Sequence, residues 1–339
     1  MKAYEIREFG LDKLAMVELD TPKPGPGEVL VRMRAASLNY RDLMMIEGMY
    51  NPKLKLPLIP FSDGAGEVTT VGDGVTKWAV GDRVCPIFMQ GWIDGPVDYQ
   101  KSKTTLGGDL DGCLREYAVF NQEGLVSIPA HLSFEEAATL PCAGVTAWHA
   151  ITVSGQVKMG ETVLVQGTGG VSIFALQFAK MFEANVIITS SSDGKLERAR
   201  EIGADDIINY KEREDWDSAV LDLTEKAGVD HVIEVGGAAT MQRSMRAVKM
   251  GGHIAVIGVV AGKGEFTTAL IFMKSLKLQG IFVGSRQMFE AMNLAIEKSG
   301  MTPEVDKVYP FVEVGDAFEY MKGGLHFGKI VVSIDSEGA

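Results

Sequence analysis

The chain has 339 residues, of which 46% are hydrophobic and 23% charged, and its 33 basic and 45 acidic side chains give a formal net charge of −12. This hydrophobic content excludes a disordered protein, and the length suits two domains that each bury a core. The acidic balance argues against a nucleic-acid partner and against an anionic membrane surface, because both attract basic proteins.

Cysteine usage and the N-terminus narrow the class further. Cys85, Cys113 and Cys142 are odd in number and far apart, so we expect neither a disulfide framework nor a Cys-x-x-Cys zinc ribbon. The first residues lack a basic-then-apolar signal, and no apolar run approaches the roughly 18 residues of a membrane span. We therefore expect a cytoplasmic protein with no membrane partner.

The first third of the chain is rich in β-strand patterns. A strand over 29–34 follows a turn-rich segment, and short β-branched pieces broken by glycine fill 64–84. Such a pattern is typical of tight hairpins that curl into a small barrel. Residues 90–111 show little periodicity. We expect them to form a loop, the kind of segment in which substrate contacts often lie.

The middle of the chain changes to alternating strands and helices. Ser133 and Glu136 have the spacing of a capping box, which predicts a short helix that Pro141 ends, and a second helix is expected from about Val145. We then expect strands over 162–166, 186–189, 206–208, 231–235, 254–258 and 278–283, and helices over 171–182, 195–202, 216–227 and 241–248.

This alternation predicts an α/β fold with a parallel sheet, right-handed crossovers, and ligands at the carboxyl ends of the strands. A helix over 289–299 and a strand over 329–334 break the rhythm. We expect this tail to return to the first domain.

A glycine-rich segment, 166–172, follows the first of these strands and opens a helix. In this context glycines permit a tight turn and close approach of a pyrophosphate, and the helix start offers free N–H groups and its positive dipole end. Ser172 stands where the pattern has its third glycine. A glycine-rich turn that binds nothing is the alternative. The expected cofactor-binding residues are Gly167, Thr168, Gly169, Gly170 and Val171.

The end of the second strand indicates which dinucleotide is bound. NAD-binding proteins place an acidic residue there to hold the ribose 2′-hydroxyl. Here Ser190 and Ser191 occupy the tip and Lys195 follows, a set that suits the 2′-phosphate of NADP. Asp193 is expected to cap the helix that contains Lys195. If the serines also only cap this helix, the choice between NADP and NAD stays open.

Several motifs together carry a resemblance to a known family. They are the segments at 24–31, 37–42, 64–68, 80–84, 167–171 and 328–331, which span nearly the whole chain. The sequence resembles the medium-chain dehydrogenase/reductase superfamily, and within it the zinc-free, quinone-oxidoreductase-like branch. The resemblance implies a GroES-like barrel domain over 1–140 and 286–339. It also implies a six-stranded Rossmann domain over 141–285, with the dinucleotide in the cleft between the two.

Zinc-dependent alcohol dehydrogenases of this superfamily take their catalytic metal ligands from a Cys-x-x-Asp segment, a Gly-His-Glu segment and a later Cys. Here Asn39 and Ser62 stand where the first Cys and the His would be, and only Cys142 matches. Catalytic zinc normally has three protein ligands. The cysteine cluster of the family's structural zinc is also missing. The five histidines, at 131, 149, 231, 253 and 326, are scattered and more typical of packing or surface positions. We expect no metal site and no zinc.

The resemblance assigns roles residue by residue. Asn39 would contact the nicotinamide side, and Tyr40 would hydrogen-bond the substrate oxygen or pass it a proton, unless its ring only packs at the cleft wall. Asp42 is expected to order the loop or cap the following helix. The remaining cofactor contacts implied by the family are Thr146, Tyr210 near the 2′-phosphate, Gly236, Gly237, Gly258, Val259, Phe282, Val283, Gly284, and Lys329 near the phosphates.

Without zinc to polarise a carbonyl, a conjugated acceptor needs less electrophilic help than a simple ketone. We therefore expect hydride transfer from NADPH to a small-molecule quinone or enone. Two alternatives stay open: an NADP-dependent alcohol dehydrogenase or carbonyl reductase acting on an alcohol, aldehyde or ketone, and a non-catalytic NADPH-binding protein. An edge strand near 278–283 would allow a homodimer, as in relatives.

Overall fold

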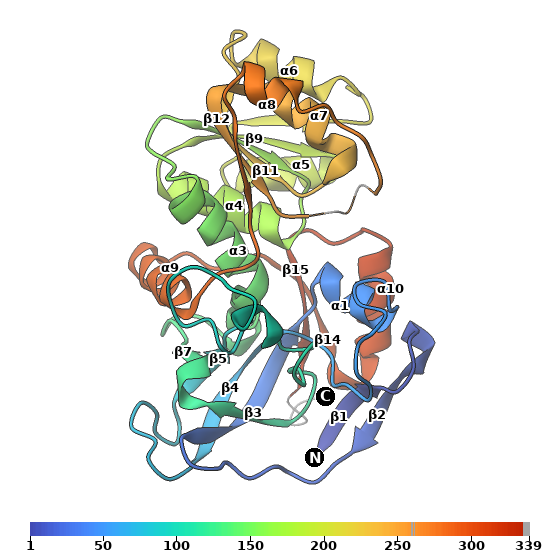
Figure 1. The fold of residues 1–339 in the computed structure, drawn as a ribbon, viewed down its shortest axis with the longest axis vertical. Helices are drawn as coiled ribbons and strands as arrows, with labels where there is room; N and C mark the ends of the chain where they lie inside the picture. The colour runs from blue at the N-terminus through green and yellow to red at the C-terminus, as the bar shows by residue number, and fades with distance from the viewer. Residues whose placement is uncertain (259, 261, 335–339) are drawn as a thin grey trace. The chain divides into compact units, whose positions relative to one another are not determined.

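The computed structural model describes residues 1–258, 260 and 262–334, and the chain folds into two units (Figure 1). The first unit holds residues 1–145 and the chain from Gly284 onward, and the second holds Thr146–Val283. The sequence placed the corresponding boundaries at 140/141 and 285/286. The tail beyond Gly284 therefore lies in the first unit.

The second unit is built on a six-stranded sheet in which every described pairing is parallel. The strand order is β10-β9-β8-β11-β12-β13. From β8 the chain adds strands outward to one side, through β9 to β10, and then to the other side, from β11 to β13. This order confirms the Rossmann prediction. The strands are β8 (Thr162–Gln166), β9 (Asn185–Ser190), β10 (Asp206–Asn209), β11 (Val229–Glu234), β12 (Val248–Val256) and β13 (Lys277–Gly280).

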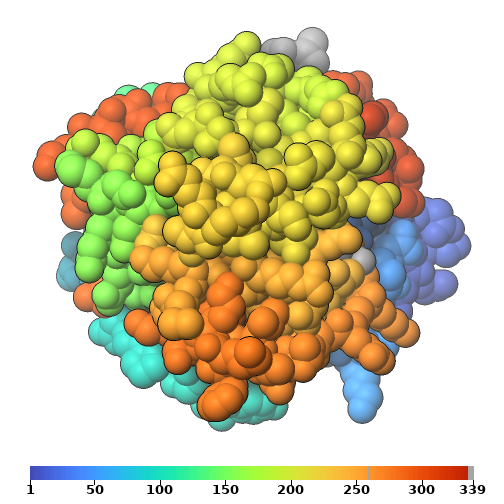
Figure 2. Space-filling model, turned by 90° about the horizontal axis from the view of Figure 1, so that it is seen from above, coloured from blue at the N-terminus to red at the C-terminus, as the bar shows by residue number. Residues whose placement is uncertain are grey.

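Helices cover this sheet and connect its strands. They are α4 (Gly170–Met181), α5 (Asp193–Glu201), α6 (Trp216–Leu223), α7 (Ala238–Ala247) and α8 (Ala269–Met273), preceded by α3 (Val145–Trp148) and the π-helical η5 (His149–Ser154). Figure 2 shows one face of the molecule, where the yellow and orange segments that include α6, α7 and α8 meet. The sequence missed α8, because five residues are too short for a helical period to show.

The β13 strand is shorter than predicted. The sequence favoured a strand over 278–283, but β13 ends at Gly280. Val283 has a φ of 58°, which no strand residue adopts and which a β-branched side chain disfavours. The apolar pattern predicted burial there correctly, since Ile281 and Val283 are buried, but it could not predict this backbone conformation.

The first unit holds a seven-stranded sheet in the order β14-β15-β3-β4-β5-β7, with β6 paired to β3, and a separate β1-β2 pair. The tail strand β14 pairs with β15, and β15 pairs with β3 of the first unit. This pairing confirms that the tail returns to the first domain. The strands are β1 (Lys2–Ile6), β2 (Leu14–Glu18), β3 (Glu28–Ser37), β4 (Asp63–Val71), β5 (Arg83–Pro86), β6 (Tyr117–Asn121), β7 (Leu125–Ser127), β14 (Val305–Pro310) and β15 (Lys329–Ser333).

The helices of the first unit are short except in the tail. The Ser133–Glu136 capping box is confirmed at the start of α2. However, α2 ends at Ala137, and Pro141 lies in the first turn of the next helix, where its missing N–H costs nothing. The helices are α1 (Tyr40–Ile46), α2 (Phe134–Ala137), the π-helical η4 (Leu140–Gly144), α9 (Arg286–Ser299), α10 (Val314–Lys322) and the 3₁₀ turns η1 (Leu11–Lys13), η2 (Lys101–Lys103), η3 (Gln122–Gly124) and η6 (Phe311–Glu313).

A mixed core fills the first unit, where β3, β4 and α10 contribute buried side chains such as Met33, Val68 and Phe318. Phe61 packs edge-on against Phe318, with ring centroids 5.5 Å apart. Phe61 directly precedes Ser62 and Asp63, so this packing fixes the start of β4. No helix within the described residues is both long and apolar enough to cross a membrane.

Candidate active site

The glycine loop of the second unit lies at the carboxyl end of β8, between β9 and β11, where the strand order reverses. This is the position at which doubly wound sheets bind ligands. Gly167 has a φ of 71°, which a glycine adopts at no cost. Gly169 is the N-cap of α4, so the helix begins at Gly170 with its free N–H groups at this edge.

Ser172 replaces the third glycine of the pattern without opening a gap. It is buried, and its Oγ donates a hydrogen bond of 2.7 Å to the carbonyl oxygen of Gln166. The hydroxyl thus ties the first turn of α4 to the end of β8. The departure from the pattern therefore keeps the close helix–strand packing that the glycine provides.

A buried carboxylate that sequence reasoning missed supports the same edge. Glu234, the last residue of β11, is fully buried and accepts hydrogen bonds from Gly237 N (2.9 Å), Thr240 Oγ1 (2.6 Å), Gln166 Nε2 (2.9 Å) and Ser244 Oγ. Because Gln166 precedes the glycine loop, one carboxylate positions the ends of β8 and β11 together. The only sequence signal was a charged residue closing an apolar strand.

The tip of β9 holds the residues expected at a 2′-phosphate. Ser190 is buried at the end of β9 and its carbonyl oxygen accepts from Tyr210 N at 3.0 Å, which brings Tyr210 beside this tip. Ser191 and Lys195 are half-buried nearby in the chain. The predicted capping by Asp193 is wrong: Ser192 is the N-cap, and the Asp193 carboxylate instead accepts from Asn209 Nδ2 at 2.7 Å.

The other predicted cofactor residues of the second unit lie at strand ends. Gly237 has a φ of 88°, and a Cβ on Gly258 would come within 2.1 Å of the Val235 carbonyl oxygen, so both positions require glycine. Gly236 lies two residues beyond the end of β11, and its N–H donates to Gln166 Oε1 at 3.4 Å. Val259 lies outside the described residues.

The segment predicted to contact the carboxamide is strained at Val283. Val283 lies at positive φ, and its carbonyl oxygen accepts from His149 Nδ1 at 2.7 Å. Burial lowers the pKa of His149, so the ring is neutral at pH 7. Strained residues of this kind cluster at ligand sites. Phe282 is 39% exposed, whereas Thr146 is buried; Gly284 belongs to the first unit.

In the first unit, Asn39, Ser62, Asp63, Cys142 and Lys329 form one hydrogen-bonded cluster. Lys329 Nζ donates to Asn39 Oδ1 at 2.7 Å and to the Leu38 carbonyl oxygen. Asn39 Nδ2 lies 3.4 Å from Ser62 Oγ, which donates to Asp63 Oδ1 at 2.8 Å. Cys142 N donates to Asp63 Oδ2 at 3.2 Å. The fold thus brings together Asn39, Ser62 and Cys142, the three positions at which the resemblance implies zinc ligands in zinc-dependent members.

The two charged groups of this cluster, the Lys329 ammonium and the Asp63 carboxylate, are both buried and compensate each other. Lys329 is 3% exposed and Asp63 is fully buried. Burial raises the pKa of Asp63, an effect that the Lys329 ammonium opposes, and burial lowers the pKa of Lys329, an effect that Asp63 opposes. Lys329 was expected near the cofactor phosphates. Two of its three N–H donors are directed at Asn39 and Leu38, so a phosphate contact stays a prediction.

The cluster does not fit a catalytic zinc ion. Asn39 Oδ1 already accepts from a buried ammonium, whose positive charge would repel a cation. Burial raises the pKa of the Cys142 thiol far above neutrality, which opposes the thiolate form that zinc requires. Ser62 supplies a neutral hydroxyl in place of an imidazole. Within the described parts of the chain, no group of three His, Cys, Asp or Glu side chains could hold a metal ion.

Helix α1 presents Tyr40 next to this cluster. Tyr40 is its first residue and is 45% exposed. Asp42 Oδ2 accepts from the Asn39 backbone N–H at 2.8 Å, which confirms the expected role of Asp42 in ordering the helix start. Arg41 Nη1 donates to the Leu106 carbonyl oxygen at 3.0 Å and so holds the 90–111 segment against α1. These contacts of α1 all lie within the first unit.

Asp42 generates a pH-dependent prediction for stability. Burial raises its pKa from 3.8 to about 6, so the folded protein keeps this proton at pH values where the unfolded chain has released it. Wild type should therefore lose stability relative to Asp42→Asn as pH rises from about 4 to 7, by about 3 kcal/mol. Urea unfolding across this range measures the difference. Asp73→Asn, at an exposed aspartate, should run parallel to wild type. Parallel curves for Asp42→Asn would contradict the assignment.

Two family models match the chain: the alcohol dehydrogenase GroES-like domain over residues 25–130 and the zinc-binding dehydrogenase model over 170–298. A zinc-type alcohol dehydrogenase-like protein of Schizosaccharomyces pombe is 47% identical over 335 residues, which cover 96% of each chain. Among solved structures, an NAD-dependent alcohol dehydrogenase is 33% identical with a TM-score of 0.90, covering 99% of this chain and 100% of that one. A quinone oxidoreductase of Coxiella burnetii is 27% identical with a TM-score of 0.81, covering 99% of both.

These matches extend along almost the whole chain and include both units. Because the S. pombe relative shares nearly half of its aligned residues with it, the chain belongs to the medium-chain dehydrogenase/reductase superfamily, whose members are pyridine-nucleotide-dependent oxidoreductases.

Proposed function

We propose that this oxidoreductase is zinc-independent, prefers NADPH, and transfers a hydride to a conjugated carbonyl compound, either a quinone or an enone. The observation that carries the proposal is the cluster in which Lys329, Asn39 and Ser62 occupy the place of a catalytic metal and its ligands. The quinone oxidoreductase among the similar structures supports this acceptor class. The NAD-dependent alcohol dehydrogenase favours the alternative of alcohol or carbonyl chemistry.

The chain's residues fit a dinucleotide. The Gly167–Val171 loop and the start of α4 suit the pyrophosphate, and the neutral, polar tip of β9 with Lys195 following suits a 2′-phosphate. Gly236, Gly237 and Gly258 lie at the neighbouring strand ends, where the family's cofactor contacts are expected, and the positive-φ backbone at Val283 suits the carboxamide. When bound, the cofactor supplies the hydride.

The residues of the first unit then stabilise the negative charge that develops on the acceptor oxygen. Hydride addition to a conjugated carbonyl leaves an electron pair that delocalises onto the acceptor oxygen, and a proton must follow. The exposed Tyr40 hydroxyl is the assigned proton donor or hydrogen-bond donor to that oxygen. The buried Lys329 ammonium supplies local positive charge next to Asn39, where relatives have a metal ion. Conjugation lowers the electrophilic help that the protein must provide.

The primary test is a screen of NADPH oxidation with quinones, enones, aldehydes and ketones, and of NADP⁺ reduction with alcohols. Quinones or enones should give the highest kcat/KM, and the rate should survive a strong chelator, because no catalytic metal is lost. Metal analysis of chelator-free protein should show far less than one zinc per chain. A stoichiometric zinc whose removal abolishes turnover would overturn the proposal. If alcohols are oxidised with the highest kcat/KM, the alcohol dehydrogenase alternative is supported. If NADPH binds but no compound of the screen is turned over, the non-catalytic alternative is supported.

Tyr40 has a matched control in the same helix region. Tyr40→Phe keeps the ring and removes only the hydroxyl, so a proton-donor role predicts a fall in kcat of about 100-fold, the usual scale for a general acid. Tyr50→Phe removes the hydroxyl of another half-exposed tyrosine and should leave kcat unchanged. Steady-state kinetics across pH measure both. If Tyr40→Phe matches wild type, the ring only packs at the site wall.

Cofactor choice is tested at the tip of β9. Ser190→Asp or the less buried Ser191→Asp adds a carboxylate that repels a 2′-phosphate and can hold a 2′-hydroxyl, so the preference for NADPH over NADH should narrow or reverse. Fluorescence titration with each cofactor measures the ratio of the dissociation constants. Ser218→Asp, on the exposed face of α6, adds the same charge elsewhere and should keep the wild-type ratio. An unchanged ratio in both β9 variants would refute the assignment.

A further inference from the structure

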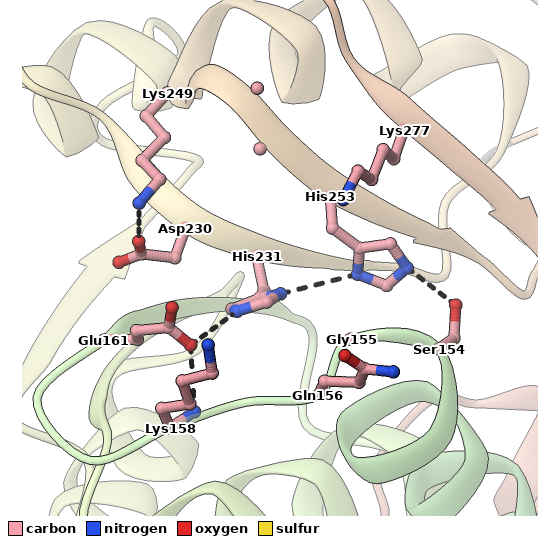
Figure 3. Close-up of a pocket in the computed structure, with 12 residues that line it drawn as sticks. Ser154, Gly155, Gln156, Lys158, Glu161, Asp230, His231, Lys249, His253 and Lys277 are labelled. Carbon is pink, nitrogen blue, oxygen red and sulfur yellow. Dashed lines mark hydrogen bonds and ion pairs between the residues drawn. The ribbon is translucent and has the colours of Figure 1, made fainter.

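The second unit has a cavity of about 310 Å³ at the edge of the sheet opposite the glycine loop (Figure 3). Its walls come from the amino ends of β11, β12 and β13 and from the segment between η5 and β8. The dinucleotide is expected at the carboxyl ends of these strands, so this cavity has no part in the proposed reaction. Two histidines, His231 and His253, lie in its wall.

Parallel pairing brings these two histidines together. His231 on β11 is in register with His253 on β12, and their Nδ1 atoms are 3.5 Å apart. The side chains are buried, at 6% and 5% exposure. His231 Nε2 lies 3.0 Å from Glu161 Oε2, and His253 Nε2 lies 2.8 Å from Ser154 Oγ. Figure 3 shows the resulting chain from Ser154 to Glu161 along the cavity.

Hydrogen-bond chemistry sets the direction of this chain. A carboxylate only accepts, so His231 Nε2 donates to Glu161 and, in a neutral ring, leaves Nδ1 as an acceptor. His253 Nδ1 must then donate to His231, which leaves His253 Nε2 to accept from the Ser154 hydroxyl. Both rings are satisfied while neutral. An added proton fits at His253 Nε2, where Ser154 can turn from donor to acceptor.

Among the described charges that face the pair, no carboxylate contacts the His253 ring, whose partners are Ser154 and His231. Asp230 is paired with Lys249, and Glu161 is engaged by His231. The ammonium groups of Lys158 and Lys277 have no hydrogen-bond or ion-pair partner among the residues that the structure describes, and both line the cavity. Burial, His231 and Lys277 together lower the pKa of His253 to about 4. In a chain with a net charge of −12, this wall is locally positive.

Helix ends offer a competing explanation for lysines at this edge. Helices that precede parallel strands end here, and their free carbonyls attract cations. Lys274 acts in this way, since its Nζ donates to the carbonyl oxygens of Met245, Arg246 and Val248 at the end of α7. Lys158 and Lys277 make no such bond within the described residues. Their charge therefore remains available to a ligand.

We propose that this cavity is a second ligand site, which binds a small phosphate-bearing anion together with a proton taken up by the His231–His253 pair. The anion supplies the negative charge that Lys158, Lys277 and a protonated His253 lack. The cavity has room for more than the phosphate group itself, so the ligand is a phosphorylated small molecule.

The test is calorimetric titration of the full-length protein with inorganic phosphate, in saturating NADPH so that the dinucleotide site is filled. Phosphate should bind, and Lys277→Gln should weaken it about tenfold, the scale of one charged hydrogen bond. Lys226→Gln, at an exposed lysine of the same unit, should bind as wild type does. Absence of phosphate binding, or equal binding by Lys277→Gln, would overturn the proposal.

A second measurement tests whether anion binding is coupled to proton uptake by the protein. Sulfate stays dianionic across the range, so a change in its affinity reports protonation of the protein. Its affinity should rise about tenfold from about pH 8 to about pH 6 in wild type and stay flat in His253→Gln, since the linked proton is lost. Thermal unfolding confirms that each variant folds. If the lysines serve only helix ends, Lys277→Gln would lower the unfolding temperature without changing anion affinity, and the proposal fails.

Discussion

The buried ammonium of Lys329 is the constraint around which the first unit is organised. It arrives on β15, a tail strand that returns to pair with β3, and it donates to Asn39 and Leu38 at the end of β3. Removing such a charge from water is costly unless it is paired and hydrogen-bonded. Asp63 on β4 provides the compensating charge. Three strands from distant parts of the chain therefore have to meet for either group to be tolerated.

The second unit solves a similar problem with a buried carboxylate. Glu234 has no ion-pair partner among the residues that the structure describes, but it receives four hydrogen bonds. They come from the Gly237 backbone N–H, the Gln166 side chain at the end of β8, and the Thr240 and Ser244 hydroxyls of α7. Charge-assisted bonds of this kind are strong, and they hold both strand ends that flank the glycine loop. The opposite edge of the same sheet carries the histidine pair. One parallel register thus sets the geometry of two edges, with the glycine-rich loop at one and the cavity of the histidine pair at the other.

Local patterns in the sequence predicted what depends on neighbours along the chain. The strand–glycine loop–helix unit at β8 and α4, the capping box at Ser133 and the return of the tail follow from short motifs or from broken periodicity. Contacts between distant residues could not be predicted in this way. His231 and His253 look scattered in the sequence because only strand register reveals that they face each other. Lys329 is predicted near the cofactor phosphates, and its burial could not be predicted because it depends on β3 and β4. Asp193 was misassigned because its partner, Asn209, comes from the next strand.

The residues at the three expected zinc positions are matched by the charges and hydrogen-bond donors around them. A zinc ion and its thiolate ligands form a dense cluster of opposite charges, whereas Asn39 and Ser62 are neutral and need only hydrogen-bond partners. Lys329 and Asp63 provide these partners, and Cys142, now a neutral thiol, contributes its backbone N–H rather than its sulfur. A metal ion placed here would meet an ammonium already bound to the Asn39 oxygen. The cluster is therefore a polar site in which Lys329 supplies the positive charge, and under the proposed function this charge is the electrophilic help that the first unit offers an acceptor.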